Sequence, residues 1–312
     1  MIKGIRLNIF SQCKKYGLPL WQCPQLLFLM MGAVIIASIL LAYFIGNRFI
    51  ETPELVALVV ILSAAALFVI SYIIIHSFDR LAEVARLKSE FISIVSHQLR
   101  SPLSNLKWAA DFLMSGRLGE IENKQAEYFK ILKENSARME QLISDLLIVS
   151  RIETATLPFI KKEVSLVDLA GKAAKAVKPY ALASNVEIKI SDAANLPRVF
   201  TDESQVVQVI EIFLDNAIRY ISEKGEIALK IFKRKGNICV EVVDSGVGIP
   251  EADKKYIFQK FFRSANALRH QTEGSGLGLY IAKAIIKRSG GKIGFKSQEG
   301  KGSTFWFTLP IK

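Results

Sequence analysis

Two long apolar runs near the N-terminus are the strongest hydrophobic pattern in the chain. Leu26–Ile45 and Leu55–Ile75 contain 20 and 21 residues without a charged side chain. A helix of roughly 20 residues, rising about 1.5 Å per residue, spans a hydrocarbon core of about 30 Å. Buried core helices are disfavoured because neither run has a polar face. A cleaved signal peptide is disfavoured because some 25 residues precede the first run and no small-x-small cleavage site follows it. The pattern predicts transmembrane helices at 26–45 and 55–75.

The charges beside these runs predict their orientation. The N-terminal segment 1–25 contains four basic residues and no acidic residue, whereas the loop 46–54 contains one Arg and two Glu. Because basic segments stay on the cytoplasmic side, we expect both termini in the cytoplasm and a multi-pass protein of the cytoplasmic (inner) membrane, surrounded by membrane lipid. The loop is too short to fold into an extracytoplasmic sensing domain.

A heptad repeat follows the second run. Residues 76–87 contain no Gly or Pro and predict a helical linker, and the repeat continues beyond it. One row of the repeat consists of Phe78, Ala85, Ile92, Leu99, Leu106 and Leu113. This spacing is typical of a helix packed in a bundle. With Ile92 as position a, His97 falls at position f, which faces solvent. Pro102 should bend the same helix.

A second heptad helix is expected from about 121 to 152. Its row contains Phe129, Leu132, Ser136, Met139, Ile143 and Leu146. The two helices predict an antiparallel hairpin over residues 88–154. One hairpin cannot bury its own apolar row, so we expect two chains to form a four-helix bundle as a homodimer.

After Thr154 the pattern changes to alternating short strands and amphipathic helices. Helices are expected at 166–183, 203–221 and 277–289. Strands are expected at 157–164, 186–191, 198–201, 226–235, 237–243, 292–297 and 303–309. This order predicts an α+β sandwich over residues 157–312.

The composition is apolar and basic at once. The chain of 312 residues is 51% hydrophobic and has a net charge of +12, which suits a membrane protein with a basic cytoplasmic part. Nucleic acid is not expected as a partner, because Lys and Arg are spread along the chain without a long basic tract. Three distant cysteines, Cys13, Cys23 and Cys239, show no metal-binding spacing and indicate a reducing compartment.

Four segments of the C-terminal region together indicate a nucleotide pocket. They are Leu214–Tyr220, Asp244–Pro250, Phe258–Arg263 with the polar stretch to Thr272, and Gly274–Leu279. An Asn side chain offers an oxygen to Mg²⁺, and a carboxylate accepts a hydrogen bond from an exocyclic amine. Glycines before a helix leave N–H groups for phosphate. Each segment alone is a weak signal, but the four segments in this order and spacing are a strong one. The Gly-rich run lacks the Lys-Ser/Thr of a P-loop, which rules that fold out.

With these segments, the chain resembles a membrane-bound sensor histidine kinase of a two-component system. Residues 88–154 resemble the dimerisation and histidine phosphotransfer domain, and residues 157–312 resemble the Bergerat-type (GHKL) ATP-binding domain. The resemblance implies ATP and Mg²⁺ as cofactors and a response regulator receiver domain as partner. It implies autophosphorylation followed by phosphoryl transfer to an aspartate of that regulator.

The resemblance also implies roles for individual residues. It makes His97 the phosphoacceptor, Asn216 the Mg²⁺ ligand and Asp244 the adenine anchor. Arg263 is a candidate contact of the γ-phosphate. Expected contacts of the nucleotide and its lid are Arg219, Tyr220, Gly246, Gly248, Phe258, Gly274, Gly276, Leu277, Gly278 and Thr304.

Three positions depart from the family pattern. The residue after the histidine is Gln98 instead of an acid, so it can orient the imidazole tautomer but cannot act as a general base at neutral pH. Ser101 stands where the family has Thr or Asn, and Ile212 stands where the family has a further Asn in the Mg²⁺ helix. We therefore expect a competent kinase with weak phosphatase activity, and Mg²⁺ bound with more water.

Two other functions remain open on the sequence. One is a GHKL ATPase that hydrolyses ATP to drive conformational change, although such an enzyme needs no exposed histidine on a helix. The other is a non-catalytic membrane adaptor with a degenerate pocket, which the intact Asn216 and Asp244 argue against. The stimulus, the regulator and the choice between cis and trans phosphorylation are not legible in the sequence.

Overall fold

The computed structural model describes residues 24–49, 52–117, 119, 121–193, 195–221, 224–264 and 274–311. The expected cytoplasmic segment 1–25 lies almost entirely outside the described residues, as does most of the polar stretch before Gly274. Two compact units make up the chain, residues 1–102 with 150–157 and residues 103–149 with 158–312.

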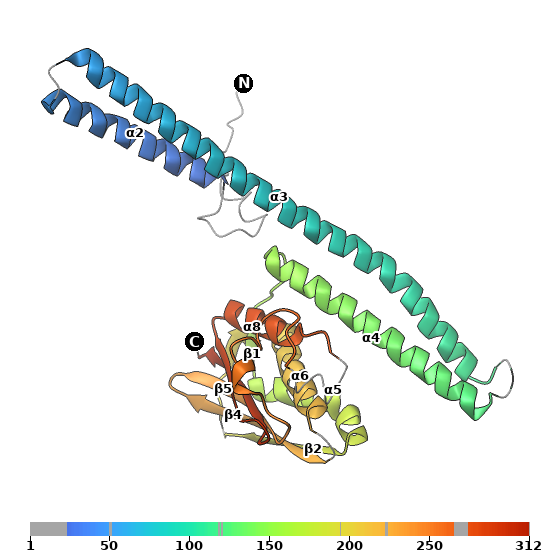
Figure 1. Ribbon diagram of the computed structural model, residues 1–312. Helices are drawn as coiled ribbons and strands as arrows, with labels where there is room; N and C mark the ends of the chain where they lie inside the picture. Colours follow the sequence, from blue (N-terminus) through green and yellow to red (C-terminus); the bar gives the residue numbers. More distant parts are fainter. Residues whose placement is uncertain are drawn as a thin grey trace, which may run out of the picture. The chain divides into compact units, whose positions relative to one another are not determined.

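The first unit contains the two apolar helices. Helix α2 spans Pro24–Phe49, and α3 spans Pro53–Met114 and continues through Pro102 (Figure 1). Phe28–Phe49 and Pro53–Phe78 are long and apolar enough to cross a membrane, with mean hydropathies of 2.5 and 2.9. Gly46 brings the two helices together, because a Cβ there would lie 2.7 Å from Cγ1 of Val56, which is buried.

Helix α4 spans Asn123–Glu153 and pairs with α3 as an antiparallel hairpin. Along α3 the residue numbers of the contacts increase while those of their partners on α4 decrease, as in an antiparallel pair. Ser89 bonds Ser150 at 2.5 Å, Ser104 donates to Glu140 at 3.2 Å, and Lys133 bridges to Asp111 at 2.6 Å. Observed helix ends lie within a few residues of the expected ones.

The hairpin buries one row of each helix and leaves another row exposed. The buried rows are Ser96, Leu103 and Ala110 on α3, and Ser136, Ile143 and Ser150 on α4. From the rows identified in the sequence, Leu99, Leu106, Leu132 and Met139 are 46%, 55%, 54% and 41% exposed. A heptad helix in a bundle faces two neighbours, and one chain supplies only one of them.

The C-terminal domain is a five-stranded sheet with helices on one face (Figure 1). The strand order is β2-β4-β5-β7-β6, in which β2 and β4 are parallel and the other pairs antiparallel. The strands are β2 (Val186–Asp192), β4 (Gly225–Arg234), β5 (Asn237–Asp244), β6 (Lys292–Ser297) and β7 (Ser303–Pro310). The helices are α5 (Leu166–Ala183), α6 (Glu203–Arg219) and α8 (Gly278–Arg288).

Alternation along the strands places the core between the sheet and these helices. On β7, Ser303, Phe305, Phe307 and Leu309 are buried, while the residues between them are half-buried on the other face. The Phe213 ring of α6 lies 5.5 Å and 6.2 Å from the rings of Phe305 and Phe307. This core fixes α6, whose C-terminal end carries three of the expected nucleotide contacts.

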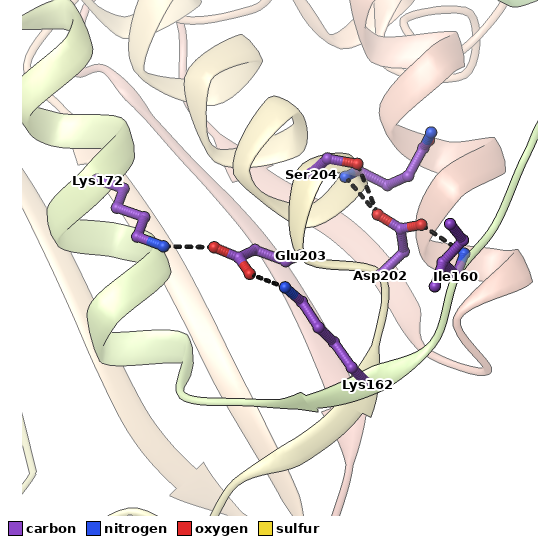
Figure 2. A network of polar contacts seen from close by, with 7 residues as sticks. Ile160, Lys162, Lys172, Asp202, Glu203 and Ser204 are labelled. Carbon is purple, nitrogen blue, oxygen red and sulfur yellow. Dashed lines mark hydrogen bonds and ion pairs between the residues drawn. The ribbon is translucent and has the colours of Figure 1, made fainter.

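A short two-stranded sheet joins the start of the domain to α6. Strand β1 (Lys162–Val164) pairs with β3 (Val199–Thr201), so most of the strand expected at 157–164 is irregular. Figure 2 shows the Asp202 carboxylate accepting from the N–H of Ile160 at 2.6 Å and from Ser204 Oγ at 2.7 Å. Glu203 pairs with Lys162 and Lys172 (Figure 2). The chain is therefore part of the domain from Ile160 onward.

Candidate functional site

A cavity of about 1400 Å³ lies in the second compact unit. Residues from α6, from the loop after β5, from the segment before α8 and from α4 line it. Of the expected site residues, the lining includes Asn216, Arg219, Tyr220, Asp244, Gly248, Arg263, Gly274, Gly276 and Gly278. The four sequence segments therefore converge on one cavity.

The C-terminal half of α6 supplies one wall of the cavity. Phe213, Leu214, Ala217 and Ile218 face the core, and the other side of the helix, with Asp215, Asn216 and Arg219, lines the cavity. Asn216 and Arg219 are one turn apart and half-buried, and Arg219 Nε donates to Asp215 at 2.7 Å. The Tyr220 hydroxyl shares a hydrogen bond with Arg263, while burial raises the pKa of that hydroxyl. A cationic and a phenolic donor thus lie beside the Asn216 amide.

Asp244 ends β5 and is almost fully buried. Its Oδ1 accepts from the N–H of Gly246 at 2.9 Å and from the N–H of Ser303 at 3.0 Å. Neither bond uses Oδ2. Burial raises the pKa of this carboxyl to about 6, although the two backbone bonds lower it in part. At neutral pH the group is therefore mainly ionised and retains an acceptor for a ligand amine.

The glycines of the site are required by close backbone packing. Gly248 has a φ of +67°, and a Cβ there would lie 2.1 Å from the carbonyl oxygen of Gln298. Gly276 has a φ of +66°, and its Cβ would lie 2.8 Å from the carbonyl carbon of Phe261. Any side chain at either position would displace a neighbouring segment of the cavity wall.

The start of α8 provides the anion-binding end of a helix. The hydroxyl of Ser275 accepts from the N–H of Leu277 at 3.2 Å. A Cβ on Gly278 would lie 3.2 Å from Cγ2 of Ile212, so this end of α8 packs closely on α6. The remaining N–H groups of the first turn and the positive end of the helix dipole favour phosphate.

Four expected contacts do not line the cavity. Leu277 is buried in the core, and Gly246 packs against the Tyr220 carbonyl. Phe258 packs edge-on against Phe295 at 6.0 Å. Thr304 lies on the other face of β7, in register with Val243 and Lys296, because strand residues alternate between faces. Its neighbour Phe305 lines the cavity instead.

The structure also adds lining residues that sequence reasoning missed. Glu211 lines the cavity from α6, and burial raises the pKa of its carboxyl. Its position one turn before Asp215, which also lines the cavity, was the available signal. Asp145 of α4 accepts from Ser275 Oγ at 2.9 Å, and burial raises its pKa. No local pattern links residues 130 positions apart.

His97 belongs to the first compact unit. It is exposed on α3, next to Ser96, which is only 2% exposed. Gln98 and Ser101 are exposed as well. The imidazole is therefore accessible to solvent and to other domains, as position f of the heptad implies.

Two family models match the chain. The His Kinase A (phospho-acceptor) domain matches residues 87–155. The histidine kinase-, DNA gyrase B- and HSP90-like ATPase domain matches residues 201–312. His97 lies inside the first match, and every cavity residue of α6 and α8 lies inside the second.

Similar proteins match this chain over most of its length. The alginate biosynthesis sensor protein KinB of Pseudomonas aeruginosa is 33% identical over 226 residues, which are 72% of this chain and 37% of KinB. The adaptive-response sensory kinase SasA of Crocosphaera subtropica is 34% identical over 75% of this chain and 62% of SasA. The chain thus spans less than two thirds of the length of either relative.

A solved structure agrees with these matches. Full-length ShkA in complex with AMPPNP has a TM-score of 0.59 and 27% identity, over 71% of this chain and 45% of ShkA. The two domain matches, these relatives and the shared fold show that the chain belongs to the sensor histidine kinases.

Proposed function

We propose that this protein phosphorylates itself on His97 with ATP and then passes the phosphoryl group to an aspartate of a response regulator. The observation that carries this proposal is the convergence of Asn216, Asp244 and the α8 N-terminus on one cavity, in a chain that also exposes His97. The bound nucleotide of ShkA supports ATP as the ligand.

In the proposed reaction a ring nitrogen of neutral His97 attacks the γ-phosphorus. The bond from that phosphorus to the β,γ-bridging oxygen breaks, ADP leaves, and the ring loses its N–H proton. Neutral imidazole is nucleophilic at pH 7, so Gln98 need not act as a base; it would accept a hydrogen bond and hold one tautomer. Water or the departing phosphate oxygens would take the proton.

The cavity residues would divide the work of binding. Asp244 Oδ2 would accept the adenine amine, and the N–H groups of α8 would hold phosphate. Arg219, Tyr220 and Arg263 line the same cavity. They would contact the phosphate chain, and the positive charge of the two arginines would stabilise charge that develops during transfer.

The donor set fits a hydrated Mg²⁺. Asn216 offers an amide oxygen and Glu211 a carboxylate, whereas Ile212 between them offers none. Mg²⁺ usually retains several waters and binds one or two protein oxygens with the phosphates of the nucleotide. When bound, the ion would neutralise phosphate charge.

The remaining architecture belongs to the same proposal. Helices α2 and α3 would span the cytoplasmic membrane with both termini inside the cell, since basic residues dominate the N-terminal flank. Residues 88–154 would form the dimerising phosphotransfer domain and residues 157–312 the ATP-binding domain. The exposed Leu106 and Leu132 support a second copy of the chain as the dimer partner.

The test is incubation of the full chain in nanodiscs with γ-labelled ATP and Mg²⁺. We expect acid-labile label that disappears in His97→Gln and in Asn216→Ala. His76→Gln is the matched control, because His76 is an exposed histidine of the same helix. ATP hydrolysis without label would favour an ATPase, and failure to bind ATP would favour a non-catalytic adaptor.

Phosphatase activity toward the regulator gives a second test. Gln98 and Ser101 replace the residues that the family ties to dephosphorylation of the regulator, so we expect weak phosphatase activity. Dephosphorylation of the regulator's aspartyl phosphate should fall several-fold in Ser101→Ala and in Gln98→Ala. A rate that is unchanged in both variants would show that these positions are not the phosphatase site.

A further inference from the structure

The end of the ATP-binding domain opposite the cavity is strongly basic. Here β4 and β7 end, β5 and β6 begin, α8 ends, and the chain arrives from α4. We call the exposed basic residues at this end the linker-end cluster. They are Lys161, Arg198, Lys233, Arg234, Lys235, Lys287, Arg288 and Lys292.

Direct contacts bring these segments together. The N–H of Ile311 donates to Gly236 O at 3.3 Å, and Ile311 also forms a bridge with Val199. Lys292 stands opposite Thr308 in the sheet, and the guanidinium of Arg288 lies 5.0 Å from the centre of the Phe159 ring. The cluster is therefore one continuous surface built from five parts of the chain.

Nearby acids do not cancel this charge. Residues 158–312 contain 25 Lys and Arg and 16 Asp and Glu, and so carry nine of the chain's twelve net positive charges. At the linker end, Glu203 is engaged by Lys162 and Lys172, and Asp202 is buried and accepts N–H and O–H groups (Figure 2). Glu163 is exposed on β1, and Asp168 and Asp192 lie farther along the same end.

Two apolar side chains project beside the cluster. Ile160 is 76% exposed and Phe200 is 42% exposed. Because Asp202 holds the N–H of Ile160 at 2.6 Å, the exposure of Ile160 is a fixed feature of the domain. Lysine and arginine around protruding apolar groups are the composition of a surface that binds anionic lipid.

The chain length limits how far this end can lie from the candidate membrane spans. Ser89 is 11 residues beyond Phe78, the last residue of the second span, which is a rise of about 16 Å along α3. Ser89 bonds Ser150, so α4 ends near that level. From Glu153 to Ile160 the chain reaches at most about 25 Å. Such a tether raises the local concentration of the membrane surface at the cluster.

We propose that the linker-end cluster, together with Ile160 and Phe200, binds the anionic lipid surface of the membrane in which α2 and α3 are embedded. The proposal depends on the membrane location proposed above but not on phosphoryl transfer. Lipid composition would then set how long the ATP-binding domain stays on the membrane surface.

The experiment compares the full chain in nanodiscs of phosphatidylcholine alone and of phosphatidylcholine with 30% phosphatidylglycerol. Amide hydrogen exchange is followed at residues 234–240 and 308–311. We expect exchange several-fold slower in the anionic discs at low salt, and loss of this protection at high salt because counterions screen the lipid charge.

Two variants with equal charge sharpen the result. Changing Lys233, Lys235, Lys287 and Lys292 to Gln should abolish the lipid-dependent protection. Changing Lys175, Lys178, Lys230 and Lys296 to Gln removes the same charge from exposed positions elsewhere and should retain it. Equal exchange in both lipids for the unchanged protein, or equal loss in both variants, would overturn the proposal. Labelling with ATP in the same discs reports phosphorylation separately, so either idea can fail alone.

Discussion

The α3–α4 hairpin and the ATP-binding domain differ in how completely one chain buries their apolar side chains. In the ATP-binding domain, Phe213 and Phe307 are fully buried by the domain's own helices and sheet. In the hairpin, Leu106 and Leu132 remain more than half exposed. The first region is complete within one chain, while the second has the surface of a bundle that lacks two of its helices.

The functional groups of the two regions also differ in burial. Asp244 is buried, and that burial raises its pKa to about 6, while His97 stands exposed on α3. A nucleotide anchor works best where water is excluded, because polar contacts are stronger there. In the proposed function, both the ATP-binding domain and a response regulator must reach the phosphoacceptor, which is easiest at an exposed position. The difference in burial thus matches a division between holding ATP and passing on its phosphoryl group.

The largest expected effect tests whether the hairpin needs a second copy. Full burial of a leucine contributes about 1.5–3 kcal/mol. Leu106 and Leu132 are about half exposed, so replacing both by Gln removes about 3–6 kcal/mol from a two-fold interface. We expect the dissociation constant of the dimer to rise by about a hundredfold or more in mass photometry of the detergent-solubilised chain. Leu182→Gln changes a leucine that is 65% exposed on α5 and should leave the dimer intact. Dimers that persist after the double change would place the interface elsewhere.

A somewhat smaller effect tests the self-sufficiency of the ATP-binding domain. Phe213→Ala should lower the free energy of unfolding of that domain by about 3–5 kcal/mol, since it leaves a cavity under Phe305 and Phe307. This loss is measured by urea unfolding, with hydrogen exchange of the β5 amides as the probe. Phe91→Ala, at a ring that is 67% exposed in the hairpin, should leave the β5 transition in place. Equal losses would show that the two regions unfold together.

A still smaller effect concerns the junction between the regions. Asp202 caps α6 and holds Ile160, so Asp202→Ala should cost about 1–2 kcal/mol and speed exchange of the Ile160 amide. Ser165→Ala removes the cap of α5 and should leave that amide protected. Burial raises the pKa of Asp202, but its hydrogen bonds with Ser204, Ile160 and Gln205 together outweigh burial and lower that pKa overall. Its contribution is therefore present above the ordinary carboxyl pKa and is lost as the pH falls through the lowered value.

The smallest effect is a pH dependence confined to the buried region. As the pH falls through about 6, Asp244 becomes protonated and its oxygen competes less well for the adenine amine. Binding of adenosine, which has no titrating phosphate, should weaken several-fold between pH 7.5 and pH 5, as measured by calorimetry. Asp244→Asn should bind weakly at every pH and lose this dependence. A wild-type affinity that is flat over this range would contradict the assigned role.

The contrast between the regions also explains how far sequence reasoning reached. Most strand and helix bounds in the ATP-binding domain were predictable from local alternation and glycine positions, whereas most of the strand expected at 157–164 is irregular. The alternation of Phe305, Phe307 and Leu309 already puts Thr304 on the opposite face of β7, so its expected nucleotide contact came from the family resemblance and not from the local pattern. The contact between Asp145 and Ser275 joins residues 130 positions apart and had no signal at all. In the hairpin, the heptad pattern located the apolar rows but could not say which row faces the same chain.

In the proposed function, ATP held in the cavity phosphorylates the exposed imidazole of His97. Fragmentation mass spectrometry of the full chain after incubation with ATP and Mg²⁺, under alkaline conditions that preserve phosphohistidine, tests this claim most directly. We predict a single phosphate on the ring of His97, absent in Asn216→Ala. Phosphate on Ser96 or Ser101, or on His76 in place of His97, would contradict it.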